Sequence, residues 1–114
     1  MPAKLIDGKA IAAAVRQEVA DEVAAIKEKT GSVPTLAVVL VGENPASQTY
    51  VASKGKACIE AGMGSITHRL PATATQAEVE DLVRSLNADP EVNGILVQLP
   101  LPKGLNERPV LDLI

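Results

Sequence analysis

The segment "TLAVVLVG", Thr35 to Gly42, is a continuous run of apolar and β-branched residues that starts directly after Pro34. A run of this length suits a strand, and the lack of polar residues at alternate positions favours burial of both of its faces. Strands of that kind belong to parallel sheets that are covered by helices. This segment therefore predicts an α/β domain.

The segments that follow alternate between helical and strand patterns. Asn44 and Pro45 resemble the start of a helix, and Gly62 resembles its end. Further on, Thr75 and Glu78 have the spacing of a capping box at a second helix start. In chain order we predict a helix, a strand, a helix and a strand in "ENPASQTYVASKGKACIEAG" (43–62), "GSITHRLP" (64–71), "TQAEVEDLVRSLNAD" (75–89) and "VNGILVQLPLP" (92–102).

A long amphipathic helix is predicted before the first strand, from Asp7 to Lys29, with Gly31 as its stop signal. Its apolar positions recur at helical spacing, at Ile11, Val15, Val19, Val23 and Ile26. The order of elements is then a helix followed by βαβαβ, which gives a parallel sheet with right-handed crossovers. The predicted fold is one three-layer α-β-α domain over residues 1–114.

The C-terminal segment "LNERPVLDLI", 105–114, is an apolar periodic stretch with no terminating residue after it. Natural chains seldom end in the middle of such a pattern. We therefore expect the sequence to be a piece of a longer protein.

The composition argues against several classes of function. A total of 11 Lys and Arg against 14 Asp and Glu gives a net charge of −3, which disfavours nucleic-acid binding. No apolar run is long enough for a membrane span, and the N-terminus lacks the apolar core of a signal peptide, so we expect a cytoplasmic protein. The single cysteine, Cys58, and the single histidine, His68, are too few soft ligands for zinc, and we expect no metal.

Ser47, Tyr50 and Lys54 are the first candidates for a functional site. In the predicted helix after Pro45 they lie at i, i+3 and i+7, on one face that starts at the carboxyl edge of the sheet, where such folds bind ligands. Tyr50 is the only aromatic residue, and its ring can stack on a planar ligand. Lys54 can transfer protons where its surroundings are poorly hydrated. Spacing alone leaves an alternative open, in which Tyr50 covers the edge of the core and Lys54 and Lys56 form a solvated face.

Gln98 ends an apolar strand and is followed by "LPLP", whose prolines cannot continue a ladder of hydrogen bonds. An amide there can orient a neighbouring lysine or a substrate, and the alternative is a strand-end glutamine bonded to loop backbone. We interpret His68 as a surface or satisfied side chain and Cys58 as a small core residue. Gly62 and Gly64 lead into a strand instead of out of one, and therefore form no dinucleotide-binding fingerprint.

The motif "VGENPASQTYVASKGKAC" together with "GILVQLPLP" resembles the bifunctional methylenetetrahydrofolate dehydrogenase/methenyltetrahydrofolate cyclohydrolase family. The resemblance extends over the whole chain, from "LIDGKAIA" onward. It implies a Rossmann-like N-terminal, substrate-binding domain of a folate enzyme of one-carbon metabolism and purine biosynthesis. In that family NADP accepts a hydride from methylenetetrahydrofolate, and the methenyl product is hydrolysed to formyltetrahydrofolate. The folate would lie in a cleft between this domain and an NADP-binding domain, and the full-length enzyme would be a homodimer.

The resemblance also implies roles for single residues. Tyr50 would stack on the pterin and p-aminobenzoate region of the folate, Lys54 would assist the water that attacks the methenyl carbon, and Gln98 would hold Lys54. Ser47 would support the site by hydrogen bonding. The remaining substrate contacts that the resemblance implies come from Leu99 and Pro100.

The chain also departs from the family pattern. Gly55 stands where relatives usually have Arg or Lys, at a cost in helix propensity of about 1 kcal/mol relative to Ala. The family's pterin-binding aspartate motif and its NADP-binding domain would lie beyond Ile114, so we expect this chain alone to lack dehydrogenase activity and to bind folate weakly. Two other classes stay open, namely a non-catalytic α/β ligand-binding module and the substrate domain of another two-domain dehydrogenase, such as the shikimate or amino-acid types.

Overall fold

The computed structural model describes residues 2–114, and its central element is the strand β1 (Thr35–Val41). β1 pairs in parallel with β2 (Gly64–Leu70) and with β3 (Gly94–Val97), which gives the strand order β2-β1-β3. The register places Val39 beside both His68 and Val97. Because β1 is covered on both faces, its residues from Ala37 to Val41 are all buried, as the apolar run predicts.

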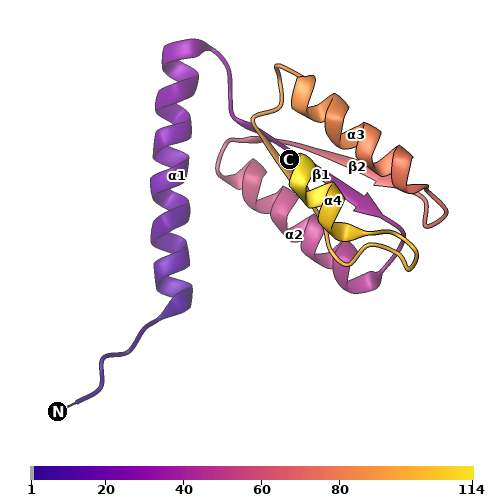
Figure 1. Ribbon diagram of the computed structural model, residues 1–114. Helices are drawn as coiled ribbons and strands as arrows, with labels where there is room; N and C mark the ends of the chain where they lie inside the picture. Colours follow the sequence, from indigo (N-terminus) through magenta and orange to yellow (C-terminus); the bar gives the residue numbers. More distant parts are fainter. Residues whose placement is uncertain (1) are drawn as a thin grey trace.

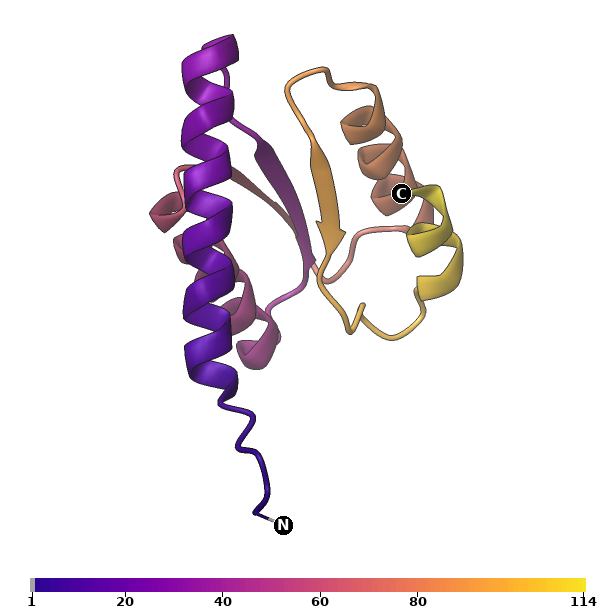
Figure 2. The ribbon, with the colours of Figure 1, turned by 90° about the vertical axis from the view of Figure 1, so that its left-hand side faces the viewer.

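Helices cover both faces of the sheet (Figures 1 and 2). One face packs against α2, where Val38 and Leu40 of β1 meet Val51. The other face packs against α3 and α4, where Val39 joins Val83 and Val110 in the main core. The predicted parallel sheet with helices on both sides is therefore confirmed. The helices are α1 (Gly8–Thr30), α2 (Pro45–Glu60), α3 (Gln76–Ala88) and α4 (Glu107–Leu113).

The long helices begin close to where the sequence predicts, and each start is capped by a side chain. The side chains of Asp7, Asn44 and Thr75 each accept a hydrogen bond of 3.1 Å from the backbone N–H three residues on. α1 ends at Gly31, whose φ of 75° lies in the left-handed region that glycine adopts without strain.

The strand β3 is shorter than the sequence predicts. The expected strand residue Asn93 bonds the start of β1 with backbone and side chain. Its N–H donates to the Thr35 carbonyl at 2.9 Å, and its Oδ1 accepts the Thr35 N–H at 2.9 Å. At the other end Pro100 and Pro102 carry no N–H for a ladder. Regular pairing is thereby limited to Gly94–Val97.

The helix α1 stands beside the three layers and does not belong to one of them (Figure 1). The apolar stripe of α1, which we define as Ile11, Val15, Val19, Val23 and Ile26, is the amphipathic face that the sequence predicts. Val23 is its only buried member within the described chain, whereas Ile11, Val15 and Ile26 are 52%, 49% and 42% exposed. Both faces of the sheet are already occupied by α2, α3 and α4, which leaves no sheet surface for this stripe.

Within residues 2–114, no helix combines the length and the apolar character that crossing a membrane requires.

We predict that Gly55→Ala stabilises the domain. Gly55 lies inside α2, and a Cβ added there would meet only Ser65 Oγ, at an ordinary 3.5 Å. The alanine should raise the free energy of unfolding by about 1 kcal/mol and the midpoint of thermal unfolding by several degrees. The contrasting variant is Gly64→Ala, whose Cβ would lie 2.5 Å from Thr35 Oγ1 and should destabilise the domain. Calorimetry of both variants decides, and a Gly55→Ala protein that melts below the wild type contradicts the prediction.

We predict that the 114-residue chain self-associates through the apolar stripe of α1, because contiguous apolar surface of this kind favours association. The variant Ile11→Glu/Val15→Lys removes apolar area from the stripe and adds an i, i+4 ion pair that supports the helix. It should shift the chain toward the monomer in sedimentation velocity. The matched control, Ala10→Glu/Ala14→Lys, makes the same charge changes outside the apolar stripe, about 100° around α1 from Ile11 and Val15, and should leave association unchanged. A wild-type chain that is monomeric at all concentrations refutes the prediction.

Candidate functional site

The alternation of β3 directs Gln98 toward α2. Leu96 packs with the α2 side of the core and Val97 with the side of α3 and α4, so the next residue in extended backbone returns to the α2 side. The N–H of Gln98 still donates to the Val39 carbonyl at 2.9 Å, which fixes its backbone to the central strand. Gln98 is only 8% exposed. A buried amide therefore lies at the carboxyl edge of the sheet.

Lys54 of α2 meets this amide. Its Nζ donates to Gln98 Oε1 at 2.7 Å, and Gln98 Nε2 donates to the carbonyl of Leu99 at 3.1 Å. An ammonium can only donate and a carbonyl can only accept, so these two partners leave one orientation for the amide. Both alternatives from the sequence are thus combined, because Gln98 bonds loop backbone with one end and contacts a lysine with the other.

The carbonyl of Leu99 is shared by a second donor, Ser47 in the first turn of α2. Ser47 is 2% exposed, and its Oγ donates to this carbonyl over a long 3.4 Å. The peptide bond between Leu99 and Pro100 is cis. The shared Leu99 carbonyl could not be predicted from the sequence, since a backbone oxygen leaves no signal there. The structure thereby brings Ser47, Lys54 and Gln98 together around one loop.

Tyr50 lies one helical turn before Lys54 and is 58% exposed. This exposure argues against the alternative in which its ring covers the edge of the core. Lys56 is solvated, with 78% of its side chain exposed and a 3.9 Å contact to Glu60, whereas Lys54 is half-buried. Among the ion pairs of residues 2–114, none involves Lys54. Lys54 therefore lies one turn from an exposed aromatic ring and forms no ion pair within this part of the chain.

The loop after Gln98 forms part of a pocket of about 450 Å³ at the carboxyl edge of the sheet. Pro100 lines this pocket, and Leu99 is 37% exposed beside it. The other lining residues come from the end of β1 and the following turns, and they are Val41, Gly42, Glu43, Asn44, Ala72, Leu101, Pro102 and Lys103.

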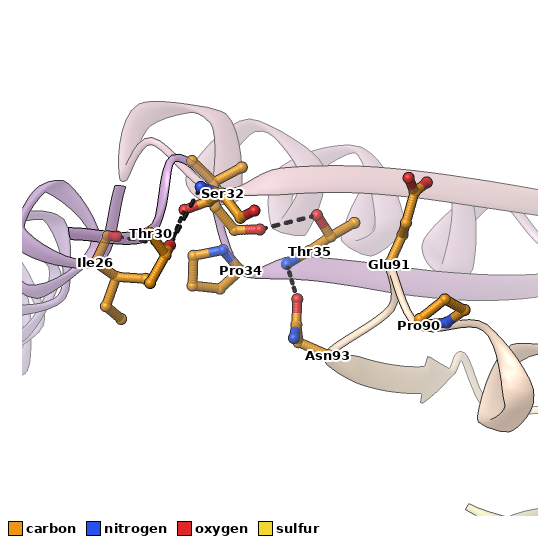
Figure 3. Close-up of a pocket in the computed structure, with 9 residues that line it drawn as sticks. Ile26, Thr30, Ser32, Pro34, Thr35, Pro90, Glu91 and Asn93 are labelled. Atoms are coloured by element: carbon orange, nitrogen blue, oxygen red, sulfur yellow. Dashed lines mark hydrogen bonds between the residues drawn. The ribbon is translucent and has the colours of Figure 1, made fainter. Parts of the chain in front are cut away.

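A larger pocket, of about 610 Å³, lies at the opposite, amino edge of the sheet (Figure 3). Its polar groups bond to one another, as Figure 3 shows for the Thr35 N–H and Asn93. The Thr30 hydroxyl likewise donates to the Ile26 carbonyl at 2.8 Å. None of the site residues predicted from the sequence lines it, whereas Pro100 lines the pocket at the carboxyl edge, where Lys54 meets Gln98. We therefore place the candidate site at the carboxyl edge in spite of the smaller volume there.

The two remaining candidates from the sequence lie apart from this site. Cys58 is a free, buried cysteine on α2, which confirms its interpretation as a small core residue. His68 is half-buried on β2, where it pairs in register with Val39. Within residues 2–114, no group of three or more His, Cys, Asp or Glu side chains is arranged to hold a metal ion.

Comparison with known proteins identifies the family to which the chain belongs. The chain matches the family model described as tetrahydrofolate dehydrogenase/cyclohydrolase, catalytic domain, over residues 6–114. It is 60% identical to the bifunctional protein FolD of Cereibacter sphaeroides over 114 residues, which are 100% of this chain and 38% of that protein. It is 59% identical to the bifunctional protein FolD 2 of Geobacter metallireducens over 110 residues, or 96% of this chain and 38% of that protein.

Solved structures give the same result. The bifunctional enzyme FolD, methylenetetrahydrofolate dehydrogenase/cyclohydrolase, of Campylobacter jejuni superposes with a TM-score of 0.94 and 47% identity over 97% of this chain and 39% of that chain. The N5,N10-methylenetetrahydrofolate dehydrogenase-cyclohydrolase of Trypanosoma brucei, in complex with NADP cofactor and inhibitor, has a TM-score of 0.91 and 38% identity over 100% of this chain and 39% of that chain. The chain thus spans about two fifths of the length of the relatives that it matches.

Proposed function

Because this chain belongs to the tetrahydrofolate dehydrogenase/cyclohydrolase family, we propose that it forms the folate-binding and catalytic part of a bifunctional enzyme of one-carbon metabolism. The observation that carries the proposal is the 2.7 Å hydrogen bond between Lys54 and Gln98, at the edge of the sheet where α/β folds bind ligands. The exposed ring of Tyr50, one turn away, supports a planar substrate such as a folate. The family match decides against the substrate domain of an unrelated dehydrogenase.

In the proposed cyclohydrolase reaction, water attacks the cationic methenyl carbon and must lose a proton. Lys54, as the free amine, would take that proton. One carbon–nitrogen bond then breaks, and the proton passes to the released nitrogen, which yields formyltetrahydrofolate. Gln98 would hold Lys54 in place, and Ser47 would fix the loop through the Leu99 carbonyl. Leu99 and Pro100 would contact the substrate from that loop.

The proposed dehydrogenase reaction requires a nicotinamide cofactor that accepts a hydride. Gly62 and Gly64 do not form a dinucleotide fingerprint, because Gly62 follows α2, Gly64 is the first residue of β2, and no strand leads into this pair. We therefore assign NADP binding to the part of the relatives' length that this chain does not span, on the likeness to the Trypanosoma brucei structure with NADP. A homodimer, a cytoplasmic location and a supply of one-carbon units to purine biosynthesis are proposed on the family resemblance alone. The absence of metal, nucleic-acid and membrane partners likewise stays a prediction.

We predict that Lys54→Met abolishes cyclohydrolase turnover in a protein of the relatives' length that carries this chain. Methionine keeps the apolar stem and removes the amine, and the loss of a positioned acid or base lowers a rate by about 10²-fold or more. The matched control is Lys56→Met on the same helix, whose side chain is 78% exposed and should not affect turnover. Equal cyclohydrolase rates for the two variants would favour the alternative of a non-catalytic ligand-binding module.

We predict that a folate analogue shifts the ring signals of Tyr50 in NMR spectra of the 114-residue chain. Stacking of the analogue places the tyrosine protons in its ring current, and Tyr50 is the only aromatic residue, so the assignment is unambiguous. Affinity should be weak, because this chain supplies only one wall of the proposed cleft. Glutamate alone, which lacks the rings, is the control and should cause no shift. Unchanged Tyr50 signals at millimolar folate analogue would contradict stacking on this ring.

A further inference from the structure

The backbone between Gln98 and Pro102 has few N–H groups that can form hydrogen bonds. It leaves the sheet after the bond from Gln98 N–H to Val39, and neither Pro100 nor Pro102 has an N–H. In the stretch Pro100–Pro102, the N–H of Leu101 is therefore the single backbone donor. Whatever accepts that hydrogen bond determines where the loop lies.

The acceptor is the carboxylate of Glu107, in the first turn of α4. Its Oε2 lies 2.9 Å from the Leu101 nitrogen in a partly buried position. A carboxylate accepts from N–H groups more strongly than a neutral group does. Leu101 is 8% exposed and packs with Val110, which is fully buried, so α4 itself is held against the core.

The same loop crosses from one face of the sheet to the other within four residues. Gln98 lies on the side of α2, where it bonds Lys54, and Leu101 lies on the side of α4, where it bonds Glu107. The Leu99 carbonyl between them accepts from Ser47 and Gln98. A displacement of Leu101 would therefore move this carbonyl and rotate the Gln98 amide away from Lys54.

We propose that Glu107 is a positioning residue for the Lys54 site, acting from the opposite face of the sheet through Leu101 and the Leu99 carbonyl. Its consequence for catalysis rests on the function proposed above, whereas its consequence for the loop does not. Capping of α4 does not require this carboxylate, because Asn106 already caps the helix by accepting the Arg108 N–H at 3.3 Å. The role of Glu107 is thus the hydrogen bond to Leu101, not the start of the helix.

Two variants separate the hydrogen bond from the charge. Glu107→Gln keeps the length of the side chain and an oxygen acceptor but loses the charge, whereas Glu107→Asp keeps the charge near the start of α4 and is too short by one methylene to reach Leu101. Asp112→Asn is the control, since Asp112 lies on the same helix, is 62% exposed and bonds only Arg108 among the described residues. A role of the charge alone predicts loss of Leu101 protection from Gln and none from Asp. The proposal predicts a larger loss from Asp than from Gln.

The first measurement is amide hydrogen exchange and side-chain NMR of the 114-residue chain. In Glu107→Asp the Leu101 amide should exchange at least about tenfold faster, because an N–H without an acceptor is no longer protected from water. The Gln98 side-chain NH₂ signals should also shift, because the loop has moved. Glu107→Gln should raise the exchange rate of Leu101 less than Glu107→Asp, because its neutral oxygen still accepts the N–H but more weakly. Asp112→Asn should retain the wild-type values. The proposal would be overturned if Glu107→Asp and Asp112→Asn had equal Leu101 exchange rates and equal Gln98 signals. Equal loss of Leu101 protection in Glu107→Asp and Glu107→Gln would also overturn it.

The second measurement is cyclohydrolase kinetics in a protein of the relatives' length that carries this chain. Glu107→Asp should lower kcat by about tenfold or more through misplacement of Lys54, while Glu107→Gln should stay within about threefold of the wild type. Unchanged kcat in a Glu107→Asp protein whose Leu101 amide has lost protection would overturn the catalytic consequence. A wild-type protein without folate activity would refute the proposed function instead, and the exchange measurement would still decide the role of Glu107 in the loop.

Discussion

The structure depends on a constraint at β1, which is paired along both edges and covered on both faces. Neither set of its alternating side chains can reach water, so polar groups from Ala37 to Val41 would be buried without partners. The strand therefore needs apolar surfaces on both sides, and α2 supplies one while α3 and α4 supply the other. The positions of these helices follow from that requirement.

The alternation that builds the core also builds the site. β3 follows β1 in register, so its even and odd residues serve the same two faces, and Gln98 is the first residue on the α2 side after the strand ends. Gln98 contacts Lys54 there because α2 runs back along the sheet from Asn44. An amide at this position accepts a hydrogen bond from Lys54 without adding a negative charge beside the amine, whereas a carboxylate there would favour the protonated form. A glutamine therefore holds the lysine in place without forming an ion pair with it.

Local signals in the sequence predicted most of the fold. Caps at Asp7, Asn44 and Thr75 and the apolar run of β1 act through neighbouring atoms, so they can be recognised without the rest of the chain. The placement of α1 could not be predicted, because periodicity shows that a helix has an apolar stripe and not what that stripe contacts. The short β3 was missed because Asn93 bonds Thr35 with its side chain as well as its N–H, which the apolar pattern does not show. The carbonyl of Leu99 and the carboxylate of Glu107 were missed because their partners are fixed by tertiary structure.

The prolines around Leu101 explain why a distant residue can matter to this site. Each proline restricts the backbone and thereby lowers the entropy that the loop loses on folding, which favours one loop conformation. Each also removes a donor, so few hydrogen bonds are left to select which conformation that is. The loop is consequently stiff between its anchors and sensitive to each of them. In such a segment a displacement of the anchor at Leu101 should also displace the Leu99 carbonyl and Gln98, because Pro100 and the residue before it, Leu99, have restricted backbone conformations.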